Sequence, residues 1–134
     1  MKFYIASRFE NCEQVNDLAG KLKSAGWTQT HDWTSPGTSK ESSVEMITQA
    51  GIRAFNGVKE ADVIIILTPQ GRGTHTELGM AIALNKRIYL CHVDDAYFKC
   101  DDNTSVFYWL PQVRQFVGSI DGAADMLISS QNEF

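Results

Sequence analysis

The chain has 134 residues, of which 43% are hydrophobic and 21% charged, and its formal net charge at pH 7 is −4. This length and composition predict one soluble globular domain over residues 1–134, with a core that needs no metal or disulfide support. The acidic balance argues against a general nucleic-acid binder, which usually carries a basic stripe.

The first third of the chain predicts two strands separated by a helix. Residues 2–6 (KFYIA) form a strand, and residues 27–32, which alternate weakly, form another. Between them Asn11 is the expected N-cap of a helix, with Gln14 at capping-box spacing and Gly26 as the C-terminal stop. The apolar stripe of this helix consists of Val15, Leu18, Ala19, Leu22 and Ala25.

A turn-rich loop at residues 33–40 precedes a second helix. Ser42 or Ser43 can cap this helix, which should run to about residue 59. Its apolar positions include Val44, Ile47, Ile52, Phe55 and Val58.

The central stretch predicts a strand, a helix and a further strand. Residues 62–67 (DVIIIL) form a short unbroken run of mainly β-branched residues, typical of a strand covered on both faces. Pro69 ends it, Gly71, Arg72 and Gly73 form a flexible turn, and Thr74 opens a helix to about residue 85. Residues 87–92 are the next strand, and the polar residues 93–104 predict a mobile loop. A fifth strand at residues 115–118 and a closing helix at residues 121–129 complete the order.

Strands that alternate with helices in this way predict a parallel sheet with right-handed crossovers. We therefore expect an α/β fold: a single-domain flavodoxin-like (Rossmann-like) open parallel sheet of about five strands with helices on both faces. In such sheets ligands bind outside the carboxyl ends of the strands, which is where Glu77 lies.

Several common site motifs are absent from the sequence. Gly71-x-Gly73 is not followed by a third glycine at dinucleotide-binding spacing, and neither GxxxxGK[ST] nor GxSxG occurs. His31, His75 and His92 belong to separate elements, and Cys91 and His92 with Asp94 lack metal-ligand spacing. The three cysteines show no paired spacing and indicate reduced thiols. With no signal peptide or membrane span in the sequence, they favour a cytoplasmic location.

Glu77 has two interpretations from spacing alone. Thr74 and Glu77 fit the capping box S/T-x-x-E, in which the carboxylate bonds the backbone of Thr74. Alternatively, helix N–H groups lower its pKa and hold it ionised. A carboxylate held in that way can attack a sugar at the anomeric carbon, as in retaining glycosidases.

Three segments, IASRF, FNGVKEADVIIIL and GRGTHTELGMAIALNKRIYL, together resemble the nucleoside 2-deoxyribosyltransferase superfamily over most of residues 2–92. That superfamily includes the 2′-deoxynucleoside 5′-phosphate N-hydrolases. The resemblance implies that Glu77 attacks C1′ of the deoxyribose and forms a glycosyl-enzyme, which a second base or water then resolves. It also implies a nucleoside or nucleotide as small-molecule partner, no metal or organic cofactor, and a homodimer or higher homo-oligomer, with residues 103–108 as a candidate contribution to a neighbouring site.

The resemblance implies further site residues. Ser7 and Arg8 should hold phosphate or sugar, the alternative for Arg8 being a solvated loop charge. Trp33 should cover the base, the alternative being a core tryptophan. Phe3 aligns with a catalytic tyrosine, while Tyr4 points to the opposite sheet face. The remaining substrate-binding positions are Gly71, Arg72, Gly73, Thr74 and His75.

Two positions depart from the family pattern. Ala54 stands where an aspartate assists proton transfer, and Gln70 and Gly71 stand at a second acidic position. Asp32 or His75 could supply the missing acid. The rival interpretation is a non-catalytic nucleotide-binding or sensor module that keeps the pocket without turnover.

Overall fold

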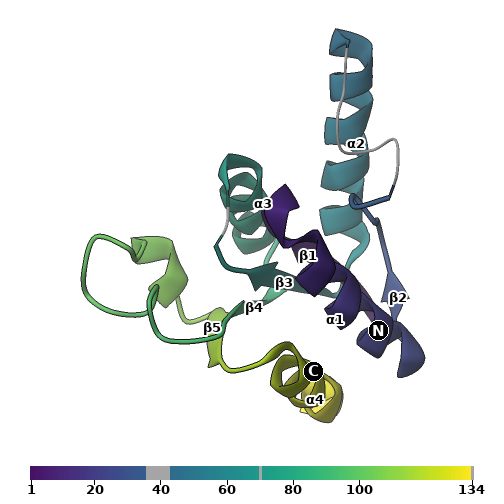
Figure 1. Ribbon diagram of the computed structural model, residues 1–134. Helices are drawn as coiled ribbons and strands as arrows, with labels where there is room; N and C mark the ends of the chain where they lie inside the picture. Colours follow the sequence, from purple (N-terminus) through teal and green to yellow (C-terminus); the bar gives the residue numbers. More distant parts are fainter. Residues whose placement is uncertain (36–42, 70, 134) are drawn as a thin grey trace.

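The computed structural model describes residues 1–35, 43–69 and 71–133. Within these residues one parallel sheet has the order β2-β1-β3-β4-β5, and the order reverses between β1 and β3 (Figure 1). The strands are β1 (Lys2–Ala6), β2 (Thr28–Gln29), β3 (Val63–Leu67), β4 (Arg87–His92) and β5 (Val113–Val117). The flavodoxin-like prediction is confirmed.

Helices cover both faces of the sheet, as predicted. The helices α1 (Cys12–Ser24) and α4 (Ile120–Ser130) share one hydrophobic core with the strands, and α2 (Val44–Glu60) and α3 (Arg72–Ala83) share the other. Short 3-10 helices occur at η1 (Phe9–Asn11), η2 (Val106–Trp109) and η3 (Gln131–Glu133). Of these, η2 follows the predicted loop after β4 and was not expected from the sequence.

The strand predictions differ in accuracy. β1 and β4 have the predicted bounds, and β3 begins one residue later than predicted. β2 is much shorter than predicted and covers only Thr28–Gln29. Trp27 before it is buried, and Thr30 after it still donates its backbone N–H to the Phe3 carbonyl at 2.9 Å. β5 begins at Val113, which is buried, two residues before the predicted start.

The predicted helix ends are correct in part. Ser43 accepts a hydrogen bond from the backbone N–H of Met46 and caps α2, whereas Ser42 lies outside the described residues. Gly26 has a φ of +93° after α1, which confirms it as a stop. Asn11 is the N-cap residue of α1, as predicted, but its side chain makes no capping bond, so the capping-box part of the prediction is wrong. Its amide instead donates to Ser7 Oγ at 2.8 Å and to the Pro69 carbonyl at 3.0 Å.

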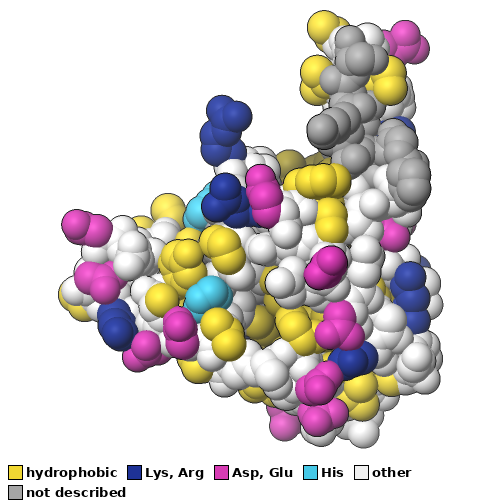
Figure 2. All heavy atoms as spheres, viewed as in Figure 1, with side chains coloured by type: hydrophobic (Ala, Val, Ile, Leu, Met, Phe, Trp, Pro, Cys, Tyr) yellow, Lys and Arg dark blue, Asp and Glu magenta, His cyan; other side chains and the backbone are white. Residues whose placement is uncertain are grey.

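The helix α2 touches the sheet only near its C-terminus and projects beyond it (Figure 1). Val58 is fully buried, whereas the other apolar positions of the predicted stripe (Val44, Ile47, Ile52 and Phe55) are 40–80% exposed. Figure 2 shows hydrophobic side chains on the projecting part. The close approach occurs at Gly57, where an added Cβ would lie 2.9 Å from both the Tyr4 ring and His31 Cβ.

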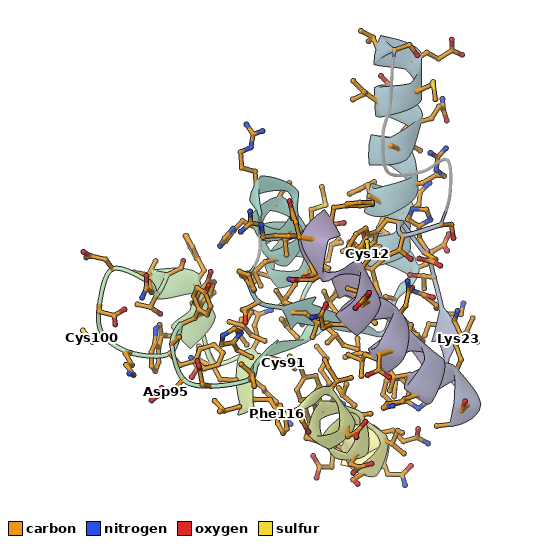
Figure 3. All side chains as sticks on the ribbon, in the orientation of Figure 1. Cys12, Lys23, Cys91, Asp95, Cys100 and Phe116 are labelled. Atoms are coloured by element: carbon orange, nitrogen blue, oxygen red, sulfur yellow. The ribbon has the colours of Figure 1, made fainter. Side chains whose placement is uncertain are left out.

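The cysteines Cys12, Cys91 and Cys100 are free, and Figure 3 shows Cys12 and Cys100 far apart. Among the described residues, no helix is long and apolar enough to cross a membrane.

Candidate active site

A cavity of about 790 Å³ lies at the carboxyl end of β1, on the α2/α3 face, beside the reversal of strand order between β1 and β3. In open α/β sheets such a reversal opens a crevice where ligands bind. The walls come from β1 and the residues after it, from the segment after β2, and from α2 and α3.

Glu77 lies in this cavity and accepts a hydrogen bond from the Tyr4 hydroxyl. Burial raises the pKa of Glu77 to about 7, although the hydrogen bond from Tyr4 works in the opposite direction. Burial and the neighbouring carboxylate raise the pKa of Tyr4 far above its usual value, so Tyr4 stays protonated and remains the donor. The carboxyl group is therefore about half ionised at pH 7, and the predicted lowering of its pKa is wrong.

The predicted capping box at Thr74 and Glu77 is also wrong. The helix α3 begins at Arg72 with Gly71 as its N-cap, so Thr74 is a buried residue inside the helix and Glu77 lies in the second turn. At that depth a carboxylate has passed the free N–H groups of the first turn, and the side chain of Glu77 instead meets Tyr4.

Phe3 and Tyr4 face opposite sides of the sheet, as predicted, but it is Tyr4 that faces Glu77. Adjacent strand residues face opposite sides, and here Phe3 packs among the residues of the α1/α4 core while Tyr4 faces α2 and α3. The position aligned with a catalytic tyrosine therefore faces away from Glu77, and the next residue carries the hydroxyl. The alternation itself could have identified Tyr4, if α3 had been assigned to the correct face.

The two predicted ligand contacts that follow β1, Ser7 and Arg8, both line the cavity but differ in the bonds that their side chains make. Ser7 lines it, but its hydroxyl already donates to the Leu67 carbonyl at 2.7 Å and accepts from Asn11. Arg8 also lines it; its Nε lies 3.5 Å from a carboxylate oxygen of Glu10, and both side chains are exposed.

The predicted turn at the start of α3 also reaches the cavity. Gly71, Arg72, Gly73 and Thr74 all line it, with Arg72 exposed in the first helical turn. The first N–H groups of this helix and the Arg72 guanidinium together favour an anion at this end of the cavity. Figure 2 shows Lys and Arg side chains gathered above α3, next to an acidic side chain.

Trp33 and His31 come from the segment after β2. The Trp33 indole N–H donates to the Ile5 carbonyl at 2.7 Å, which holds the ring against the cavity. His31 lines the same wall as Ala54 and Arg53, and burial followed by the Arg53 charge lowers the pKa of His31 below its usual value. His31 and Arg53 were not predicted as site residues; the proximity of His31 to Trp33 in the sequence is the signal that could have found it.

The two acids suggested in place of Ala54 lie elsewhere. The His75 ring bonds the Tyr108 hydroxyl at 2.7 Å, on the side of α3 towards η2, and is not among the residues that line the cavity. The Asp32 carboxylate accepts hydrogen bonds from Thr34 and Ser35. Burial acts to raise the pKa of Asp32, but these hydrogen bonds outweigh it and hold the pKa below its usual value. Neither group is placed to give a proton in the cavity.

The described residues contain no group of three or more His, Cys, Asp or Glu side chains that could hold a metal ion. The cavity combines a half-buried, hydrogen-bonded carboxyl group with arginines at its rim and an indole at its wall. That arrangement suits a ring-bearing ligand with an anionic group and an electrophilic carbon near Glu77.

Comparisons with known proteins place this arrangement in context. No protein-family model and no curated protein matches the sequence. Several solved structures are similar in fold, including these three. A CMP N-glycosidase, BcmB, of Clostridium botulinum has 19% identity and a TM-score of 0.64, over 95% of this chain and 98% of that one. A 2-deoxyribosyltransferase of Bacillus psychrosaccharolyticus has 18% identity and a TM-score of 0.67, over 93% and 91%.

The third structure, a conserved protein of Enterococcus faecalis, has 14% identity and a TM-score of 0.56, over 98% of both chains. The first two are named as a CMP N-glycosidase and a 2-deoxyribosyltransferase. The resemblance noted in the sequence is therefore confirmed as a likeness of fold.

Proposed function

We propose that this protein cleaves or transfers the N-glycosidic bond of a (deoxy)nucleoside or its 5′-monophosphate, with Glu77 as nucleophile. The observation that carries the proposal is the Tyr4–Glu77 pair inside the cavity at the strand reversal. Two proteins of the same fold are named for N-glycosidase and deoxyribosyltransferase activity, which supports this choice of chemistry.

The proposed reaction has two steps. A Glu77 oxygen attacks C1′ of the sugar, the C1′–N bond breaks, and its electron pair leaves with the base. Water or a second base then attacks C1′ of the resulting ester and returns Glu77 as a carboxylate. The Tyr4 hydroxyl orients the carboxylate for the attack and stabilises it when it is released.

The base leaves in the first step as an anion with the electron pair of the C1′–N bond. In the second step we assign proton transfer to His31, which takes the proton that the attacking water or acceptor base loses and gives it to the departed base. The lowered pKa of His31 keeps the imidazole neutral at pH 7, the form that takes a proton from the resolving water or acceptor base. Ala54 stands on the same wall and has no acid–base group. Trp33 would cover the base, since its ring is held at the cavity wall.

A 5′-monophosphate suits the rim better than an uncharged nucleoside. Arg8, Arg53 and Arg72 all line the cavity, and the start of α3 adds free N–H groups. The engaged hydroxyl of Ser7 makes it a support for the cavity wall rather than the main phosphate donor. We expect kcat/KM for the monophosphate to exceed that for the nucleoside, and Arg72→Ala to reduce this preference about 10-fold, the effect of losing roughly 1.4 kcal/mol of charge-assisted bonding.

We also propose a homodimer or higher homo-oligomer. The exposed apolar side chains of α2 border one side of the cavity at Phe55, and a second copy would cover them. The segment at residues 103–108, which includes the exposed Val106 and Phe107, is the proposed contribution to a neighbouring site. Sedimentation equilibrium would measure the assembly.

A specific observation favours a second candidate, a non-catalytic nucleotide-binding or sensor module. Ala54 leaves the cavity and its arginines in place while removing an acid–base group. One experiment separates the two candidates. The protein is incubated with deoxynucleosides and their 5′-monophosphates, with and without an acceptor base, and free base is followed by chromatography.

Release that Glu77→Ala abolishes and that Glu60→Ala leaves intact supports the enzyme. Glu60 is a suitable control because it is exposed at the C-terminal end of α2, outside the cavity. Saturable nucleotide binding without release of base by the wild-type protein supports the sensor and excludes the enzyme.

A further inference from the structure

A second cavity, of about 370 Å³, lies at the same edge of the sheet on the α1/α4 face. Its walls come from the start of α1, the residues that end β3 and β4, and the start of α4. None of its lining residues lines the candidate active site. The two cavities are therefore separate, with the segment that leaves β3 between them.

The two cavities differ in the size of ligand that they suit. Ligand-binding pockets measure roughly 300–1,000 Å³. The candidate active site, at about 790 Å³, has room for a whole nucleotide, whereas about 370 Å³ suits a single small ring system.

They also differ in charge. Among the described residues that line the second cavity, none is Lys, Arg, Asp or Glu. Its apolar walls include Leu67, Cys91, Ile120 and Ala123, and its polar groups are two carboxamides, Thr68, Ser119 and His92. A cavity with this lining favours a neutral ligand with flat apolar faces over an anion.

The two carboxamides supply the means of recognition. The Asn11 amide N–H groups donate to Ser7 and Pro69, while no described residue donates to Asn11 Oδ1 or bonds the side chain of Gln14. A carboxamide presents a donor and an acceptor side by side, which matches the donor–acceptor edge of a nucleobase. Thr68 and His92 bond each other, and Thr68 also bonds the Cys91 carbonyl, so this wall is fixed in place.

We propose that the second cavity binds a free nucleobase, a neutral heteroaromatic ring with an amide-type edge. The ring packs between the apolar walls, and its polar edge pairs with Gln14 and with Asn11 Oδ1. This binding needs neither Glu77 nor a phosphate group.

Asn11 also connects this cavity to the candidate active site. Its amide donates to Ser7 Oγ at 2.8 Å, and Ser7 donates to the carbonyl of Leu67, a residue of the second cavity. A base bound against Asn11 therefore shifts the position of Ser7 and changes the affinity of the first cavity. This regulatory part rests on the proposed function, since a free base is the product of N-glycosidic cleavage; the binding part does not.

The test is calorimetric titration of the full chain with adenine, cytosine and uracil in turn, with and without a nucleoside 5′-monophosphate. We expect saturable binding of at least one base that the monophosphate does not displace. Ile120→Trp, which fills the cavity, should weaken it at least 10-fold. The matched control is Val117→Trp, because Val117 is exposed three residues earlier and does not line the cavity. Glu77→Ala should bind the base as the wild type does.

Failure of all three bases to bind overturns the proposal, as does binding that survives Ile120→Trp or is displaced by the monophosphate. If Ile120→Trp does not fold, Gln14→Leu at the exposed rim carries the test, with several-fold weaker binding expected and unchanged binding refuting the proposal. For the regulatory part, the base and the monophosphate should change each other's affinity by the same factor, and Asn11→Ala should remove that factor. Base binding in a protein that never cleaves nucleotides would leave the site standing and refute the proposed function alone.

Discussion

Replacing Tyr4 by Phe tests the central pair of the candidate active site. The substitution removes the hydroxyl that donates to Glu77 and keeps the buried ring. A hydrogen bond to a charged group contributes about 1.5–3 kcal/mol, and one pH unit corresponds to about 1.4 kcal/mol. The pKa of Glu77, already raised to about 7 by burial, should therefore rise further by about one to two pH units.

The assay is the pH dependence of kcat/KM for base release, which reports ionisation in the free enzyme. Because only the ionised carboxylate attacks C1′, the acidic limb should move from about pH 7 to about pH 8–9 in the variant. Tyr108→Phe is a matched control, since Tyr108 bonds His75 on another side of α3. An acidic limb that stays in place or moves to lower pH would refute the role of Tyr4. If the variant is inactive, a ¹³C NMR titration measures the pKa of Glu77 directly and should show the same rise.

Three further predictions concern the same region. The pKa of Glu77 is about 7 in the folded protein and 4.5 for the free side chain. Between pH 4.5 and 7 the folded state therefore binds more protons than the unfolded state. The contribution of Glu77 to the free energy of unfolding falls as the pH rises through this range. Glu77→Gln should thus unfold in urea with about 3 kcal/mol more stability than the wild type at pH 8 and show no difference near pH 4. Gly57→Ala should cost about 1–3 kcal/mol and lower Tm, because its Cβ meets Tyr4 and His31 at 2.9 Å, whereas Gly51→Ala, with open space around it, should not lower it. His31→Gln should slow resolution of the ester about 10²–10⁴-fold, so that intact-protein mass spectrometry detects the glycosyl-enzyme; slower base release without accumulation would contradict this assignment.

The sequence predicted the buried strands best. β1, β3 and β4 are short, mainly apolar runs covered on both faces, and the composition of each run sets its ends within one residue. β2 lies at an edge of the sheet, where few residues are buried, and its weak alternation overestimated its length. The start of α3 was misplaced because Gly71 caps the helix three residues before Thr74, and the capping-box pattern of Thr74 and Glu77 is coincidental.

The site was predicted in part. Glu77, the turn that precedes it, Trp33 and Arg8 line one cavity, and their roles there stay a prediction. Tyr4, which bonds Glu77, and His31, which lines the same cavity, were missed because their positions depend on packing between distant segments. Whether Phe3 or Tyr4 faces Glu77 depends on which sheet face α3 covers, and His31 reaches the cavity only because α2 closes against β1 at Gly57.

The surroundings of Glu77 argue against a purely structural role. The N-cap of α3 is Gly71, three residues before Thr74, so the helix does not need Glu77 to begin. Holding this carboxyl group where burial raises its pKa to about 7 costs about 3 kcal/mol in the ionised form, which a Gln at the same position would avoid. Functional sites typically contain residues that line a cavity, have a perturbed pKa and lower the stability of the fold. These surroundings agree with the proposed role of Glu77 in chemistry at the ligand, which the base-release assay tests.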